Sequence, residues 1–171
     1  ALADAYPQPG KAFDAGSAWR QARRAMAQHG DRLAAFMDHE PQTNEVRRSA
    51  ALLGGFLTVA RETGLPLRCF EIAASAGLNL SWDRYRYDLG GRAFGPADSA
   101  VLIAPEWRGE AAPDGDVTVA ERAGCDLHPV EADDPDHRLR MLSYIWADQP
   151  DRFEGTRHAF EIAATTLVGG G

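Results

Sequence analysis

Apolar and polar residues along this chain repeat with two different periods. Helical spacing predicts helices over residues 17–28, 31–37, 43–63, 78–85, 134–146 and 150–160. Short, nearly unbroken apolar runs or strict alternation predict extended strands over residues 67–73, 84–89, 100–104 and 117–121. Because helices and strands alternate, the pattern indicates an α/β fold with a Rossmann-like, mostly parallel sheet flanked by helices. The stretch 89–116 has little helical signal and predicts a β-rich insertion.

Capping and breaking residues place the boundaries of these elements. Ser17 and Thr43 are the predicted N-caps of two helices, and Gly64 is predicted to end the second of them in a left-handed conformation. We divide the chain into an N-terminal helical segment, 1–66, that packs on the sheet, and an α/β core, 67–171. Together they form one domain, which we expect to be incomplete at both ends.

The two cysteines suggest a reducing compartment rather than a disulfide scaffold, so we expect a cytoplasmic protein. Cys69 lies in the strand 67–73, which is expected to be buried on both faces apart from Arg68 and Glu71. Cys125 lies in a predicted turn.

The charge and hydropathy of the chain argue against two classes of partner, nucleic acids and membranes. A net charge of −7 argues against a broad nucleic-acid surface, and no apolar run is long enough to cross a membrane. Cys125 and His128 form a C-x-x-H pair with no second pair, and the acidic loop 131–137 lacks metal-ligand spacing, so no metal is expected. We expect a small-molecule partner, and the sequence leaves the oligomeric state open.

A run of small residues follows the first strand, within RCFEIAASAGLNLSWDRYRYDLGG. Small side chains let main-chain N–H groups approach a ligand where a helix starts, and ligands of open α/β sheets bind at the carboxyl ends of strands. The pattern E-x-A-x-S-x-G resembles the first motif of S-adenosylmethionine-dependent methyltransferases, with Ala73 and Ser75 where glycines are expected. The resemblance implies S-adenosylmethionine as cofactor. Glu71 would interact with its methionine end, Gly77 would allow the main chain to approach it most closely, and Asn79 would complete the cofactor turn with Ala73 and Ser75.

A second acidic residue follows a later strand, in VTVAERAGCDLHP. In methyltransferases a comparable aspartate bonds to the ribose hydroxyls, and the resemblance assigns this role to Asp126. The interval from Gly77 is longer than usual, so the insertion must be looped out. Asp83 and Asp88 are rivals for the ribose contact.

The same turn also fits two other classes of protein. Small-x-Ser-x-Gly after a strand is the nucleophile-elbow pattern of α/β-hydrolases, with Ser75 as nucleophile. Such an enzyme needs a downstream histidine, which would be His128, His137 or His158. A third hypothesis is a non-catalytic Rossmann-like binding module that kept the fold and lost the cofactor.

Two further polar stretches offer residues that line a site. In PQTNEVRRSA these are Asn44, Glu45 and Arg48, although a helix cap and local ion pairs explain the same residues. In WDRYRY they are Trp82, Asp83 and Tyr85, although a half-buried strand with paired charges explains them equally. Glu45 and His128 are the candidates for a general base.

Four blocks of sequence carry a wider resemblance: QTNEVRRSAALL, EIAASAGLNLSWDRYRYDLGG, AERAGCDLHPVE and LSYIWADQPDRFEGTRHAFEIA. In order and wording they resemble the bacterial family called domain of unknown function 2332, from about Ala18 onward. That family has no established activity, and its members are longer at both ends. The resemblance therefore implies that this chain corresponds to the middle portion of the family's length.

Overall fold

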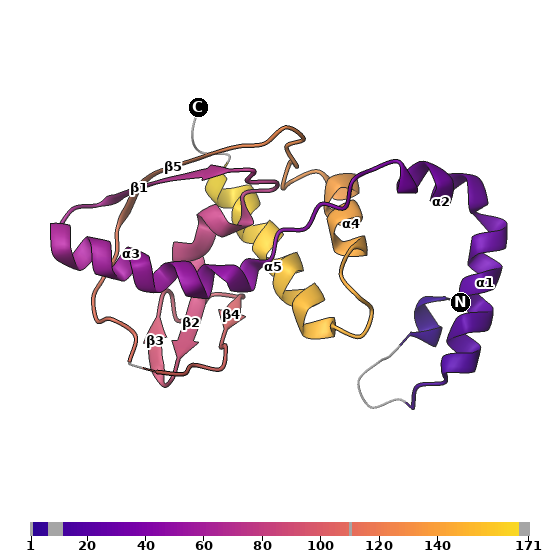
Figure 1. Ribbon diagram of the computed structural model, residues 1–171, viewed down its shortest axis with the longest axis horizontal. Helices are drawn as coiled ribbons and strands as arrows, with labels where there is room; N and C mark the ends of the chain where they lie inside the picture. Colours follow the sequence, from indigo (N-terminus) through magenta and orange to yellow (C-terminus); the bar gives the residue numbers. More distant parts are fainter. Residues whose placement is uncertain (1, 7–11, 110, 168–171) are drawn as a thin grey trace.

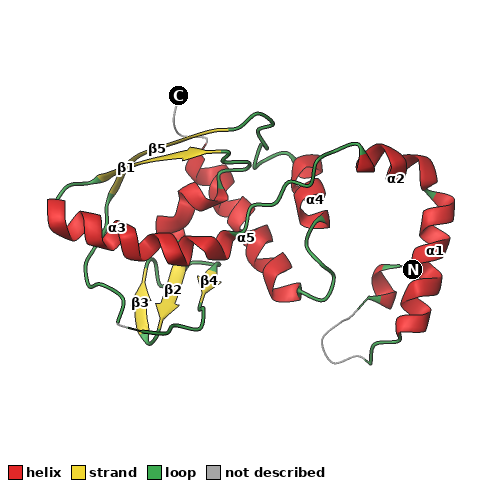
Figure 2. Ribbon diagram, viewed as in Figure 1, coloured by secondary structure: helices red, strands yellow, loops and turns green. Residues whose placement is uncertain are grey.

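The computed structural model describes residues 2–6, 12–109 and 111–167 and shows an α/β fold (Figures 1 and 2). Its α-helices are α1 Ala15–Gln28, α2 Gly30–Met37, α3 Ser49–Thr63, α4 Pro135–Ser143 and α5 Pro150–Leu167. Short 3-10 helices are η1 Ala3–Ala5, η2 Val46–Arg48 and η3 Leu78–Arg84. Its strands are β1 Leu67–Ile72, β2 Arg86–Leu89, β3 Arg92–Phe94, β4 Leu102–Ile103 and β5 Val119–Cys125. In these ranges no helix combines the length and apolar character needed to cross a membrane.

The strands form two small sheets where one mostly parallel sheet was predicted. β1 and β5 pair in parallel, with Cys69 opposite Arg122 and Ile72 opposite Cys125. β2 pairs with β3 in antiparallel and with β4 in parallel orientation, giving the order β3-β2-β4. Because β2 to β4 follow one another closely, this part of the predicted β-rich insertion builds a sheet of its own instead of extending the parallel one.

Carboxylates, not the predicted hydroxyl side chains, cap α1 and η2. Asp14, not Ser17, caps α1, and its Oδ1 accepts a hydrogen bond from Gly16 N at 2.9 Å. Glu45, not Thr43, caps η2, which leads directly into α3. An ionised carboxylate is a strong acceptor for main-chain N–H groups at a helix start. The predicted end of α3 is confirmed, since Gly64 has a left-handed φ of 65°.

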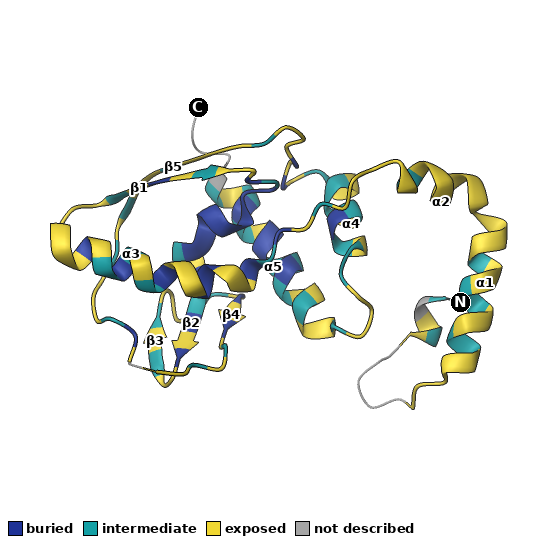
Figure 3. Cartoon of the chain, viewed as in Figure 1, coloured by how far each residue is buried: buried dark blue, intermediate teal, exposed yellow. Residues whose placement is uncertain are grey.

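The prediction that β1 is buried on both faces is wrong. Phe70 and Ile72 are 63% and 87% exposed, whereas Cys69 is buried. Side chains alternate between the faces of a strand, and η3 contacts both β1 and β5. Figure 3 shows these two strands mostly in the colours of exposed and intermediate residues. One row of apolar side chains is therefore exposed to solvent.

The core gathers around η3, the most deeply buried element. Leu78, Tyr85 and Phe160 are fully buried, and the Trp82 ring stacks on Phe56 with centroids 4.5 Å apart. η3 contacts α3, α5, β1 and β5, so it joins the parallel sheet to the helices. The segment 1–66 is divided: α3 contributes buried residues to this core, whereas α1 and α2 contribute none.

Candidate functional site

The turn after β1 has an unusual backbone. Ala73, Ser75 and Gly77 have φ values of 58°, 55° and 65°, so every second residue is left-handed. This conformation costs an L-amino acid with a Cβ about 1–2 kcal/mol, whereas glycine adopts it freely. Strain of this kind persists where the surrounding structure enforces it, and it clusters at ligand sites.

Asp126 ties this turn to the end of β5. Its carboxylate accepts hydrogen bonds from Ser75 N at 2.7 Å and from His128 N at 2.9 Å. The main-chain N–H groups of His128 and Ser75 lower the pKa of Asp126, because they favour its ionised form. Val130 N also donates to Ser75 O at 3.2 Å. The two predicted cofactor residues thus meet across the carboxyl ends of neighbouring parallel strands.

A buried pair of asparagines holds the turn from the other side. Asn44 Nδ2 donates to Ala74 O at 2.7 Å, and Asn79 Nδ2 donates to Asn44 Oδ1 at 2.9 Å. Both side chains are buried, and among the described residues Asn79 Oδ1 has no partner. The predicted site residue Asn44 therefore acts on the main chain of the turn.

Gly124 allows β5 to approach the turn closely. A Cβ at this position would lie 2.7 Å from Ala74 Cβ and 3.0 Å from Leu80 Cδ1, closer than side chains tolerate. Gly124 is the residue of β5 that pairs with Glu71. The absence of a side chain at Gly124 lets β5, the turn after β1 and η3 pack closely against one another.

An open cleft of about 1050 Å³ lies at the carboxyl ends of β1 and β5, and we call it the strand-end cleft. Ligands of open α/β sheets bind at this edge. The lining includes Ala73, Ser75 and Asp126, so the structure brings these predicted cofactor residues together at one cavity. The remaining lining comes from the segment before η2, the ends of β1 and β5 and one residue of α4: Asp38, His39, Glu40, Pro41, Gln42, Thr43, Ile72, Cys125, Leu127, His128 and Arg140.

Glu71 lies in β1, two residues before Ala73, and is half-buried. Burial raises its pKa, and the positive charge of Arg48 offsets this only in part. Within the described structure its buried Oε2 has no hydrogen-bond partner. Burial therefore destabilises the ionised carboxylate relative to its protonated form.

We expect Glu71→Gln to stabilise the protein at neutral pH. A carboxyl with a raised folded-state pKa leaves its stability contribution intact below its ordinary pKa and loses it as the pH rises through the folded value. The variant should melt at a higher temperature than the natural chain at about pH 8, and at the same temperature near about pH 4. Thermal melts at both pH values test this, with exposed Glu62→Gln as control. An equal gain at both pH values would contradict the assignment to ionisation.

We also expect Ala73→Gly and Ser75→Gly each to raise the free energy of unfolding by about 0.5–1 kcal/mol, since relief of the left-handed strain exceeds the entropy cost of glycine. Ala74→Gly is the matched control, because Ala74 is buried and its φ is not left-handed. It should lose about 1 kcal/mol instead. Urea unfolding measures all three, and destabilisation of the first two variants would refute a strained turn.

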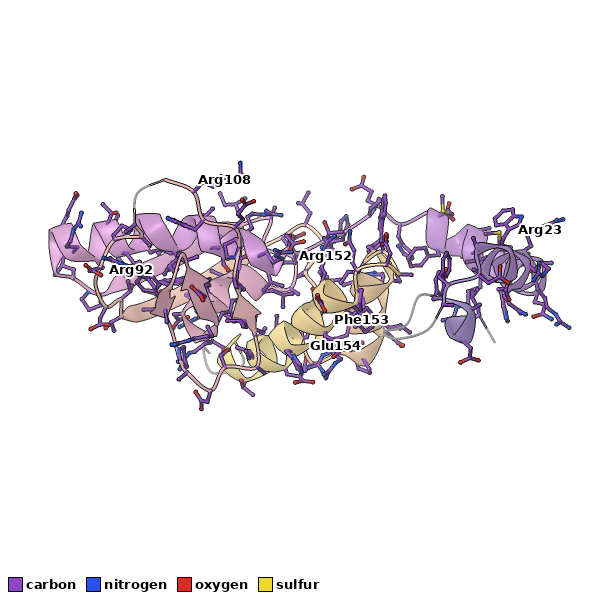
Figure 4. All side chains as sticks on the ribbon, turned by 90° about the horizontal axis from the view of Figure 1, so that it is seen from below. Arg23, Arg92, Arg108, Arg152, Phe153 and Glu154 are labelled. Atoms are coloured by element: carbon purple, nitrogen blue, oxygen red, sulfur yellow. The ribbon has the colours of Figure 1, made fainter. Side chains whose placement is uncertain are left out.

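The other predicted site residues lie elsewhere. Glu45 pairs with Arg152 of α5 at 2.6 Å, and Arg152 is labelled in Figure 4. Asp83 pairs with Arg122 at 2.7 Å. Tyr85 is fully buried and donates from its hydroxyl to Leu78 O. None of these residues, nor Arg48 or the buried Trp82, lines the strand-end cleft. The same holds for Asn44 and for the predicted cofactor residues Glu71, Gly77 and Asn79. The local explanation for the first stretch had Thr43 as the cap, whereas Glu45 is the cap and pairs with Arg152. The paired charges expected in the second stretch describe Asp83.

The hydrolase hypothesis can be compared with the surroundings of Ser75. Its Oγ contacts Met141 Sδ at 3.8 Å, and no histidine ring of the described residues hydrogen-bonds to it. His128 lines the same cleft. His137 Nδ1 accepts from Glu131 N, and His158 contacts Arg157.

One contact of this region was missed in the sequence, and one group of side chains was considered there as a metal site and set aside. Gln42 Nε2 donates to His128 O at 2.8 Å and fixes the cleft-lining segment that follows α2. The density of polar residues around Gln42 was the available signal. Glu131, Asp134 and His137 also place ligand-type atoms within 4.8 Å of one another, although no metal-ligand spacing marks them. Two of the three accept main-chain hydrogen bonds at the start of α4, which accounts for the grouping.

The fold and the cleft describe an α/β protein with a tightly held turn at the end of a parallel strand pair. A family profile described as an uncharacterized protein conserved in bacteria (DUF2332) matches residues 1–168, and the chain belongs to this family. The match covers nearly the whole chain and starts before Ala18, so it is wider than the resemblance of the four sequence blocks. No curated protein and no solved structure matches the chain.

Proposed function

We propose that this protein is a Rossmann-like, S-adenosylmethionine-dependent methyltransferase acting on a small molecule, with the cofactor in the strand-end cleft. The observation that carries the proposal is the left-handed backbone at residues 73, 75 and 77. These are the alternate positions of the E-x-A-x-S-x-G pattern. The backbone conformation that glycines would favour is thus kept even where the side chains are alanine and serine.

The position and charge of Asp126 support the same proposal. Its pKa is lowered, and it lines the cleft next to the turn. A carboxylate offers about four lone-pair directions, and main-chain N–H groups of Ser75 and His128 use two of them. The Leu127 N–H also acts on this carboxylate, and the lone-pair direction that remains is available to a ribose hydroxyl.

In such a site the bound cofactor would supply an electrophilic methyl group, and the protein would position the acceptor. Methyl transfer depends mainly on holding the two reactants in line. The turn and Asp126 would orient the cofactor, and the segment from Asp38 to Thr43 would form the opposite wall. His128 is the candidate base that lines the cleft, since Glu45 is paired with Arg152 outside it.

Calorimetric titration with S-adenosylhomocysteine tests this proposal. We expect a Kd near about 1–10 μM for the natural chain, and at least tenfold weaker binding for Asp126→Ala, because the ribose contact and the turn are lost together. Asp133→Ala, an exposed carboxylate outside the cleft, is the control and should bind normally. Absence of binding at millimolar ligand, with a folded protein by circular dichroism, would refute the proposal. Binding without methyl transfer to any acceptor would favour the non-catalytic module.

A serine hydrolase is the second candidate because Ser75 itself has the strained, left-handed backbone of a nucleophile elbow. We expect no labelling of Ser75 by a fluorophosphonate probe, since its hydroxyl contacts Met141 Sδ. Labelling that is lost in Ser75→Ala would instead establish the hydrolase.

A further inference from the structure

The N-terminal arm, which we define as residues 15–37 comprising α1 and α2, presents an apolar strip that is exposed within the described part of the chain. Trp19, Met26, Leu33 and Met37 follow one another along these helices, and all four are exposed, Met37 to 80%. Neither helix buries a single residue in the described structure. A helix face of this composition normally packs against another surface.

Contacts at the C-terminal end of the arm hold it away from the sheet of its own chain. The Phe36 and Tyr144 rings lie 5.4 Å apart, Tyr144 Oη donates to Glu40 O at 3.4 Å, and Gln42 donates to His128 O. With these contacts formed, the arm projects from the opposite end of the molecule to β1 and β5 (Figure 1). The arm strip therefore does not reach the sheet of its own chain.

The outer patch of the parallel sheet, defined as Phe70, Ile72 and Leu127, is exposed in the same way, and it adjoins the strand-end cleft, which Ile72 and Leu127 also line. Leu127 is 93% exposed and directly follows β5 and Asp126. Parallel sheets are normally covered on both faces, and here η3 covers one. Two apolar surfaces are thus exposed among the residues that the structure describes.

Charges beside the two surfaces are complementary. Arg23, Arg24 and Arg32 flank the arm strip, are exposed, and form no ion pair with another described residue; Figure 4 shows Arg23 at the outer end of the molecule. Downstream of Leu127, the exposed carboxylates are Glu131, Asp133 and Asp136, again without an ion pair in the described ranges. On the patch itself, the Arg68 guanidinium lies over the Phe70 ring and pairs with Glu121. A basic amphipathic arm suits an apolar patch that is followed by this acidic loop.

We propose that two copies of this chain form a dimer by reciprocal exchange, in which the arm of each copy covers the outer patch of the other. A twofold axis makes both contacts identical and closes the assembly. Each copy buries its own arm strip and its own outer patch in one step. Arginines of the arm lie over the acidic loop 131–136 of the other copy.

Sedimentation equilibrium of the full chain tests this, comparing Trp19→Asp in the arm, Phe70→Asp in the patch, and Leu102→Asp as an exposed control in β4. We expect a dimer for the natural chain and for the control, and a monomer for each of the other variants. All three variants replace exposed residues and should retain the natural melting behaviour. Raising the salt concentration should weaken the natural dimer, because exposed charges contribute to it.

Mixing the two monomeric variants gives the decisive result. A heterodimer of Trp19→Asp and Phe70→Asp retains one intact contact, between the arm of the second variant and the patch of the first. We expect the mixture to dimerise, more weakly than the natural chain, although neither variant does so alone. A monomeric natural chain, dimeric single variants, or a mixture that stays monomeric would each overturn the proposal.

Discussion

Replacing Asp83 by alanine is expected to lower the free energy of unfolding by about 3–5 kcal/mol. Asp83 and Arg122 form a two-pronged ion pair at 2.7 and 3.0 Å, and Arg122 also donates to Leu80 O at 2.7 Å. Their side chains are 16% and 12% exposed. Removal of the carboxylate leaves a guanidinium charge with little access to water, and that isolated charge is the main cost. Urea unfolding followed by circular dichroism measures the loss.

The double variant Asp83→Ala/Arg122→Met separates the pair from the surrounding packing. Without the buried charge, most of the lost stability should return. Glu106→Ala is the control, because the Glu106–Arg108 pair is exposed and should change stability by less than about 0.5 kcal/mol. Arg108 is labelled in Figure 4. A double variant as unstable as the single one would show that the isolated charge is not the cause.

Asn44→Ala is expected to cost about 3 kcal/mol, the second of the two largest effects. The substitution leaves Ala74 O and Asn79 Nδ2 without their partners inside the protein. Buried polar groups that lose a partner each cost roughly 1–3 kcal/mol. The turn of the strand-end cleft also loses one of its two supports, so S-adenosylhomocysteine affinity should fall with stability.

Gln42→Ala is the matched control for Asn44→Ala. Gln42 also donates from a side-chain amide to a main-chain oxygen, but near the surface, where water can replace it. We expect a loss below about 1 kcal/mol. Equal losses in the two variants would contradict a special role for the buried asparagine pair.

Part of this site could be predicted from the sequence because each step is local. Small residues after an apolar run predicted a tight turn, and Asp126 was expected near it because both follow strands. The use of Asp126 to hold Ser75 N could not be predicted, since it depends on β1 and β5 being neighbours in one parallel sheet. Asn44 was predicted as a site residue, but its contact could not be predicted. The acceptor is the main-chain oxygen of Ala74, and every residue has such an oxygen.

The predictions that were wrong have a different cause. Phe70 and Ile72 belong to an apolar run that looks the same whether one face or both are covered, and only the arrangement of helices decides this. Asp83 and Tyr85 were grouped as site residues because arginines and aromatics alternate there. In the folded chain the ion pair to Arg122 and the position of η3 in the core account for both.

The bridge between Ser75 and Asp126 has a consequence for the order in which the protein assembles. These two residues are 51 positions apart, whereas β2 and β3 pair through neighbouring residues such as Leu89 and Arg92. Closing a long loop costs more entropy than forming a hairpin, so the hairpin has a kinetic advantage and β1–β5 pairing comes late. The strand-end cleft exists only once that late pairing is complete. Recovery of ligand binding during refolding should therefore lag behind the return of helical signal.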